Sequence, residues 1–92
     1  MPYSHTTFEF DPAKSATNLA KHGIDFDVAQ ALWQDERLLQ VAAKTKDEAR
    51  FFAIGRIGEK CWTAICTQRG EAVRIISVRR ARKEEMGYYE ST

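Results

Sequence analysis

The order of apolar and polar positions along the chain predicts an α+β fold. A short β-branched and aromatic run at 6–10 is followed by two stretches with helical periodicity. Apolar runs at 50–55, 61–67 and 72–78 then succeed one another with tight turns between them, which predicts an antiparallel meander. We therefore expect an antiparallel sheet with its helices packed on one face and the other face open to a ligand.

Capping residues mark the limits of the two helices that precede the meander. Asp11 suits the N-cap of a helix over 12–22, and Gly23 suits the left-handed residue that ends it. Asp25 can cap a second helix at once, which predicts an αα-hairpin. Five apolar residues of this second helix are expected to face the core: Phe26, Val28, Ala29, Leu32 and Trp33.

The charged segment at 79–90 predicts a C-terminal helix, which Gly87 weakens. The 92 residues have an ordinary soluble composition, with 43% hydrophobic and 29% charged residues, and indicate one domain over 1–92. No apolar run approaches the ~20 residues of a membrane span. The N-terminus lacks the basic and apolar regions of a signal peptide. We therefore expect a cytoplasmic protein with no membrane partner.

Charge is unevenly distributed along the chain, although the formal net charge is only +1. Residues 1–49 hold five Lys or Arg against eight Asp or Glu, whereas residues 50–92 hold nine against five. A basic C-terminal half indicates an anionic partner such as RNA. A merely solvated surface is the alternative interpretation of this asymmetry.

Four polar residues of the first predicted helix share one stripe, because Lys14, Asn18, Lys21 and His22 lie at i, i+4, i+7 and i+8. The cationic members can contact phosphate, and His22 can also exchange a proton near neutral pH. The alternative is a solvated helix face that ends in a histidine.

Arginines gather in and around the predicted strands. Arg50 opens one strand, Arg74 lies inside the last strand, and Arg79 and Arg80 end it. Guanidinium groups bind phosphate bidentately and suit the charge that develops on phosphorus during RNA cleavage. Only one of Arg79 and Arg80 can follow the open face while the strand persists, but the turn into the helix could bring both to one site.

Glu85 and Tyr89 lie four residues apart on the predicted C-terminal helix, and therefore on one face. They can transfer protons, hold the arginines in place, or belong to a salt-bridged surface helix. Cys61 and Cys66 would point to opposite faces of one strand, which disfavours a disulfide. Metal-ligand spacings and Gly-rich phosphate loops are missing from the sequence, so we expect neither a metal nor a cofactor. RNA cleavage would then proceed by attack of a 2′-hydroxyl, with lysine, histidine or glutamate handling the protons.

Over about residues 8–90, the chain resembles the BrnT toxins, a branch of the RelE-like ribonuclease toxins of type II toxin–antitoxin systems. The first block of the resemblance comprises Phe8, Glu9, Asp11, Lys14, Asn18, Lys21, His22, Gly23, Phe26 and Ala29, with Phe10 where the family usually has Trp. The second comprises Glu48, Arg50 and Gly55. The third comprises Arg74, Ile75, Ile76, Ser77, Arg79, Ala81, Glu85 and Tyr89.

This resemblance implies a RelE-like fold and a ribonuclease toxin that arrests translation and growth. It also implies a cognate antitoxin with a ribbon-helix-helix DNA-binding half. Together they would form a heterotetramer that contacts operator DNA only through the antitoxin. The candidate catalytic residues by position are Lys21, His22, Arg50, Arg79, Arg80, Glu85 and Tyr89, with Lys14 and Arg74 as RNA contacts.

Two other functions are compatible with the sequence. A catalytically inactive homologue could serve as an antitoxin-binding module in a transcription-repressing complex. A DNA-binding regulator could use residues 12–34 as a helix-turn-helix. The second helix of that motif carries Asp27, Asp35 and Glu36 but no cation before Arg37, which makes it a poor reader of DNA.

Overall fold

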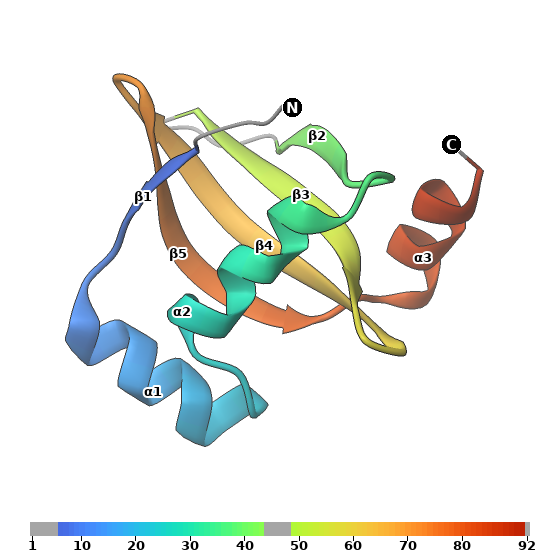
Figure 1. Ribbon diagram of the computed structural model, residues 1–92. Coiled ribbons are helices and arrows are strands. Elements are labelled where there is room, and N and C mark those ends of the chain that lie inside the picture. Colours follow the sequence, from blue (N-terminus) through green and yellow to red (C-terminus); the bar gives the residue numbers. More distant parts are fainter. Residues whose placement is uncertain (1–5, 44–48, 92) are drawn as a thin grey trace.

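The computed structural model describes residues 6–43 and 49–91 and confirms the α+β class (Figure 1). Its elements are β1 (Thr7–Glu9), α1 (Pro12–His22), α2 (Phe26–Ala29), the 3₁₀ helix η1 (Gln30–Gln34), β2 (Leu39–Ala43), β3 (Arg50–Ile57), β4 (Lys60–Arg69), β5 (Ala72–Arg80) and α3 (Lys83–Glu90). Glu48 of the family pattern lies outside the described residues. No helix in the described part of the chain is long and apolar enough to cross a membrane.

The five strands form one sheet in the order β1-β5-β4-β3-β2. Strands β2 to β5 pair in antiparallel fashion, and for β3 to β5 this confirms the meander that the tight turns predict. Strand β1 instead pairs in parallel with β5, from Thr7 opposite Ala72 to Glu9 opposite Arg74. The expectation of a purely antiparallel sheet is therefore wrong. The chain crosses over through the helices and the other strands between β1 and β5, and such a crossover permits parallel pairing.

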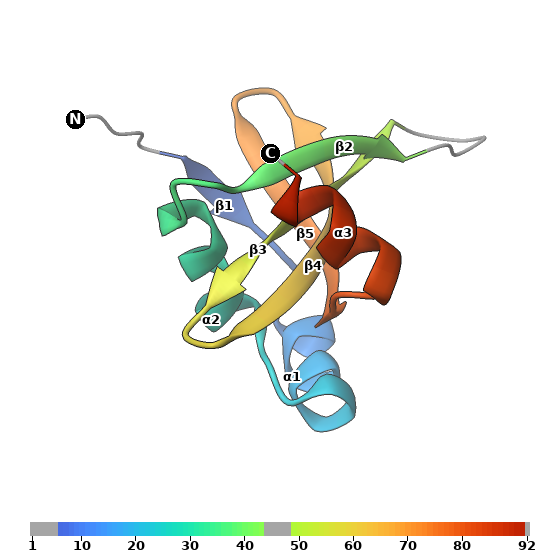
Figure 2. The same cartoon turned by 90° about the vertical axis from the view of Figure 1, so that its right-hand side faces the viewer.

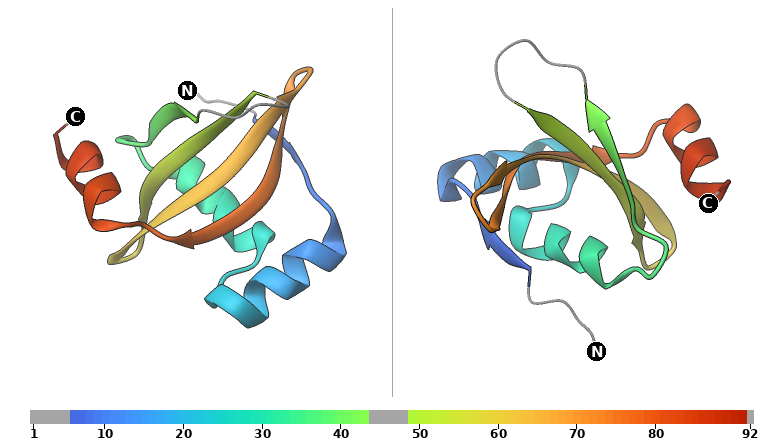
Figure 3. Two further views of the ribbon diagram at one scale, coloured as in Figure 1. Left: turned by 180° about the vertical axis from the view of Figure 1, so that it is seen from behind. Right: turned by 90° about the horizontal axis from the view of Figure 1, so that it is seen from above.

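The sheet curves around α2 and η1, whereas α3 lies on its opposite side (Figures 2 and 3). The expectation that every helix packs on one face is wrong for α3. The side chain of Glu85 on α3 accepts a hydrogen bond from Thr63, and Thr63 points away from α2. Polar contacts therefore hold α3 on the second face of the sheet, a position that the pattern of apolar residues did not indicate.

The main core lies between the sheet and the segment formed by α2 and η1. Phe26, Ala29 and Leu32 are buried there, as expected. Val28 is 50% exposed, contrary to expectation, because residues two apart on a helix do not share a face. Trp33 is partly buried and packs edge-on against Phe8, with ring centroids 4.9 Å apart. The sheet contributes Ala53, Trp62, Ala64, Cys66, Val73, Ile75 and Val78 to this core.

The predicted limits of α1 are confirmed. The Asp11 side chain accepts a hydrogen bond from the backbone N–H of Ala13, and Gly23 adopts a left-handed φ of 80°. The segment after Gly23 is not one long helix but a turn of α2 followed by η1. Such a short segment, with its apolar side buried in the sheet, does not present a recognition helix for DNA.

Asn18 fixes α1 against β5. Its Nδ2 donates to the carbonyl oxygens of Val78 and Ile24 at 2.9 and 2.8 Å, and its Oδ1 accepts from the N–H of Val78 at 3.2 Å. The amide thus satisfies backbone groups of β5 beyond the point where β1 ends. Asn18 is only 6% exposed, so it packs between α1 and β5, whereas the other three residues of the predicted stripe face solvent.

Replacing Asn18 with alanine should lower the free energy of unfolding by at least about 1–3 kcal/mol, because buried backbone groups lose their partners. Thermal and denaturant unfolding would measure the loss, which corresponds to several degrees in Tm for a chain of this size. Thr17→Ala removes an exposed polar side chain from the same helix and should change stability by no more than about 0.5 kcal/mol. Equal stability of Asn18→Ala and wild type would contradict this role.

Candidate active site

The register of the sheet places three arginines on the face that points away from α2. Arg50 lies opposite Thr67, and Thr67 lies opposite Arg74. Arg79 lies opposite Thr63 in a second row of the same face. Directly opposed residues in neighbouring strands share a face, so the three guanidinium groups project to one side of the sheet.

A β-bulge in β5 is what brings Arg74 and Arg79 to the same side. The two residues are five positions apart, and in a regular strand they would point to opposite faces. Cys66 pairs with Ile75 while Ile65 pairs with Ser77, which leaves Ile76 as the extra residue of the bulge. The inserted residue restores a common face for both arginines.

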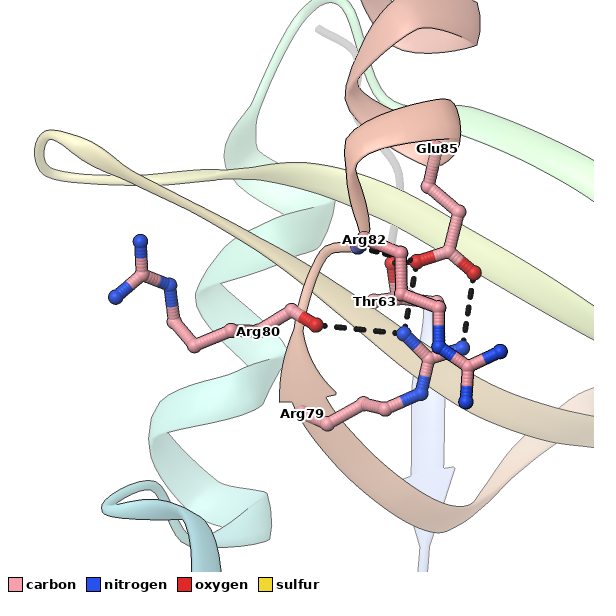
Figure 4. A network of polar contacts seen from close by, with 5 residues as sticks. All are labelled: Thr63, Arg79, Arg80, Arg82 and Glu85. Atoms are coloured by element: carbon pink, nitrogen blue, oxygen red, sulfur yellow. Dashed lines mark hydrogen bonds and ion pairs between the residues drawn. The ribbon is translucent and has the colours of Figure 1, made fainter.

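Arg79 is held by Glu85 in a bidentate ion pair (Figure 4). Its Nη1 and Nη2 donate to Oε1 and Oε2 of Glu85, each at 2.8 Å. Glu85 also accepts from the backbone N–H of Arg82 at 2.8 Å and from the Thr63 hydroxyl at 2.9 Å. Nη1 also donates to the carbonyl oxygen of Arg80 at 3.3 Å. A guanidinium carries five N–H groups, so Arg79 still has donors for a phosphate after these three contacts.

The electrostatics of this pair favour the ionised form of Glu85. The hydrogen bonds from Arg79 lower the pKa of Glu85 to about 2, although burial opposes the shift. The same contact raises the pKa of Arg79. A carboxylate with such a low pKa is a weak proton acceptor at neutral pH.

Arg80 lies on the other face, so the end of the strand does not bring both arginines to one site. Side chains of β5 alternate between the two faces to the end of the strand, because β5 stays paired with β4 as far as Arg80, which lies opposite Trp62. The Arg80 guanidinium lies 5.5 Å from the centre of the Trp62 ring, on the core side of the sheet. Figure 4 shows the Arg80 side chain extending away from that of Arg79.

Tyr89 anchors α3 and is not part of the arginine face. It is 4% exposed, and its hydroxyl donates to Oδ2 of Asp35 at 2.6 Å. Burial and this hydrogen bond raise the pKa of Tyr89 to about 12. Asp35 also accepts from the backbone N–H of Arg56, next to Gly55, whose missing Cβ would lie 3.1 Å from Asp35 Oδ2.

Lys14, Lys21 and His22 are exposed on α1 and border one hollow of about 220 Å³ together with Ser77 of β5. Ser77 lies opposite Ile65, on the arginine face of the sheet. The helix stripe expected from the sequence therefore exists. It flanks the arginine face at the edge of β5 and does not surround Arg79.

Two further residues of this face were not singled out as candidates for chemistry. Glu9 forms an ion pair with Arg74, with Oε1 and Nη1 3.2 Å apart and both side chains partly exposed. Only the parallel pairing of β1 with β5 brings them together, so local spacing carried no signal. The centre of the Phe52 ring lies 6.0 Å from the Arg79 guanidinium. The sequence did indicate its side of the sheet, because Phe52 is two residues from Arg50 in one predicted strand.

A family model described as ribonuclease toxin, BrnT, of type II toxin–antitoxin systems matches residues 10–85. The chain belongs to the BrnT family. BrnT proteins are ribonuclease toxins, and membership in a type II system implies a protein antitoxin as partner. A search among curated proteins found no match. Within residues 6–43 and 49–91, no three His, Cys, Asp or Glu side chains are grouped as metal ligands.

Glu85→Gln should weaken the dependence of stability on acid pH. The pKa of Glu85 is about 2 in the folded protein, below the ordinary value of 4.5, so its ionisation stabilises the fold above about pH 4.5. Wild type should lose roughly 2–3 kcal/mol of this contribution as the pH falls from 4.5 towards 2.

Urea unfolding at a series of pH values from 6 to 2.5 would measure the effect. The stability difference between wild type and Glu85→Gln should shrink as the pH falls. Glu84→Gln removes an exposed carboxylate of the same helix and serves as the control, with a pH dependence like that of wild type. Parallel curves for wild type and Glu85→Gln would exclude the assigned role of the pair.

Proposed function

We propose that this BrnT family member cleaves single-stranded RNA without a metal ion, with Arg79 bound to the scissile phosphate. The observation that carries the proposal is the bidentate hold of Glu85 on Arg79, on the face that also presents Arg50 and Arg74. A preorganised guanidinium suits an oxyanion that gains charge in the transition state.

In the proposed reaction, the 2′-oxygen attacks the adjacent phosphorus and the bond from phosphorus to the 5′-oxygen breaks. The 2′-hydroxyl loses its proton to a base, and the departing 5′-oxygen gains one. The products are a 2′,3′-cyclic phosphate and a 5′-hydroxyl. Arg79 stabilises the charge on the non-bridging oxygens throughout this step.

We assign the proton transfers to the α1 side of the site. Glu85 and Tyr89 are poorly suited, because their pKa values of about 2 and 12 lie far from neutral pH. Lys21 and His22 are exposed beside Ser77, two residues from Arg79 along β5. His22 is the proposed proton acceptor, and Lys21 a second cation near the phosphate.

Arg50 and Arg74 extend the phosphate-binding surface along the strands. Both lie opposite Thr67, which is four residues along β4 from Thr63, the residue opposite Arg79. At about 3.3 Å per residue, the two rows of side chains are roughly 13 Å apart. Contacts to phosphate position a nucleic acid without reading its sequence. These two arginines would therefore orient the RNA, while Arg79 acts on the cleaved bond.

Cleavage of RNA would arrest translation and growth in the cytoplasm. A ribbon-helix-helix antitoxin would neutralise the toxin in a heterotetramer and would alone contact operator DNA. Support for these steps comes from membership of the BrnT family together with the three arginines on one face of the sheet.

Purified wild type should cleave labelled RNA in excess EDTA, and Arg79→Lys should do so roughly 10²–10³-fold more slowly. Lysine keeps a positive partner for Glu85, so the fold should survive, but it loses the bidentate geometry. Arg80→Lys is the matched control because the neighbouring side chain points to the other face. An RNA with 2′-deoxyribose at the cleaved position should remain intact.

Each part of the proposal has its own contrary outcome. Cleavage that EDTA abolishes would overturn metal independence, and full activity of Arg79→Lys would remove Arg79 from the mechanism. If wild type cleaves no RNA with or without ribosomes, the protein acts as an antitoxin-binding homologue that has lost catalysis.

Arg50→Gln and Arg74→Gln should each weaken RNA binding in a salt-dependent manner. The slope of log Kd against log salt concentration should fall by about 0.7 for each phosphate of a single strand that no longer has a cationic partner. Fluorescence anisotropy with an uncleavable 2′-O-methyl oligonucleotide between 50 and about 200 mM salt would measure the slope. Arg80→Gln should leave it unchanged, and an unchanged slope in all three variants would place the RNA elsewhere.

A further inference from the structure

A hollow of about 290 Å³ lies beside the Arg79–Glu85 pair, between α3 and the strands β2 and β3. Its apolar lining comes from Val41, Ala43, Phe52 and Ile54, and Tyr88 of α3 lines it as well. These strand residues share the arginine face, since Val41 lies opposite Phe52 and Ala43 opposite Arg50.

Tyr88 has no evident structural role on α3. Its side chain is 60% exposed, whereas the adjacent Tyr89 is 4% exposed and anchors the helix through Asp35. An exposed aromatic ring at the border of an apolar hollow offers a flat surface on which a second ring can stack. The hollow thus combines an aromatic side chain with an aliphatic floor.

The hollow is contiguous with the proposed phosphate site. Phe52 lines the hollow and also lies 6.0 Å from the Arg79 guanidinium. Glu85, which holds Arg79, is a further lining residue, and Arg82 adds an exposed cation. A phosphate at Arg79 would therefore bring an attached nucleoside to the hollow.

We propose that this hollow binds one unpaired base of single-stranded RNA, stacked on Tyr88, while the neighbouring phosphate lies at Arg79 and Arg82. The inference rests on the proposed ribonuclease function and adds a base-binding site to it. The charged lining residues are Arg82, Glu84 and Glu85, with Arg79 next to the hollow. An apolar, aromatic-lined hollow with guanidinium groups at its border matches a nucleotide, whose base is flat and whose phosphate is anionic. A purely apolar protein side chain would make no use of the exposed Arg82 guanidinium that lines the hollow.

The test is a double-mutant cycle, in which the Tyr88 side chain and one base of the probe are removed separately and together. The probe is a 2′-O-methyl oligonucleotide that spans the cleavage site found with wild type, with one base at a time replaced by an abasic unit. One abasic position should weaken binding to wild type by about 5- to 150-fold, the range expected for a stacked base. Tyr88→Ala should lose a similar factor for the intact probe and nothing further at that abasic position. Tyr88→Phe should bind like wild type.

The exposure of Tyr88 makes these variants safe for folding, and Val28→Ala controls for loss of an exposed apolar side chain elsewhere. If wild type cleaves RNA but the Tyr88→Ala and abasic losses add independently, or Tyr88→Ala binds normally, the base-binding site is wrong while the ribonuclease function stands. Normal RNA binding with loss of antitoxin binding in Tyr88→Ala would assign the hollow to the partner protein and overturn the inference. If wild type neither binds nor cleaves RNA, both proposals fall.

Discussion

The ion pair between Arg79 and Glu85 is the constraint on which the arrangement of the second face depends. Glu85 is 7% exposed and joins three elements, because its partners come from β5, β4 and the start of α3. Removing the charge of one member of such a pair leaves the other charge buried and typically costs about 3–5 kcal/mol. Helix α3 has only eight residues, too few to be stable on its own, and is held at its two ends by Glu85 and Tyr89.

The ion pair with Glu85 fixes the orientation of Arg79 and at the same time reduces the positive charge that Arg79 offers to a substrate. Arg79 has a fixed orientation, but the carboxylate of Glu85 offsets much of its charge. Glu9 likewise offsets part of the charge of Arg74, so much of the positive potential beside the pair comes from Arg82, an exposed residue at the start of α3. A near-neutral overall charge is compatible with this arrangement, because one face of the sheet concentrates the cations.

Local sequence rules predicted the features that depend on neighbouring residues. Asp11 and Gly23 defined α1, and strand alternation allowed for the separation of Arg79 from Arg80. Features that depend on distant partners could not be predicted in this way. The bulge at Ile76 has no Gly or Pro to signal it, and the parallel pairing of β1 joins residues more than 60 positions apart. The hydrogen bond between Tyr89 and Asp35 likewise joins residues 54 positions apart, so no local pattern indicated that Tyr89 would be buried.

The rows of side chains across the sheet suggest how a nucleotide chain would lie on it. Phe52, Ile65 and Ser77 form one row, which leads from the hollow beside α3 to the hollow beside α1. Cationic rows flank this mostly apolar row, with Arg79 on one side and Arg50 and Arg74 on the other. If the proposed function holds, bases would lie along the apolar row and phosphates along the cationic rows. A strand that follows this row would pass beside Arg79, whose guanidinium lies 6.0 Å from the centre of the Phe52 ring, and would lead from Tyr88 towards the helix that carries His22.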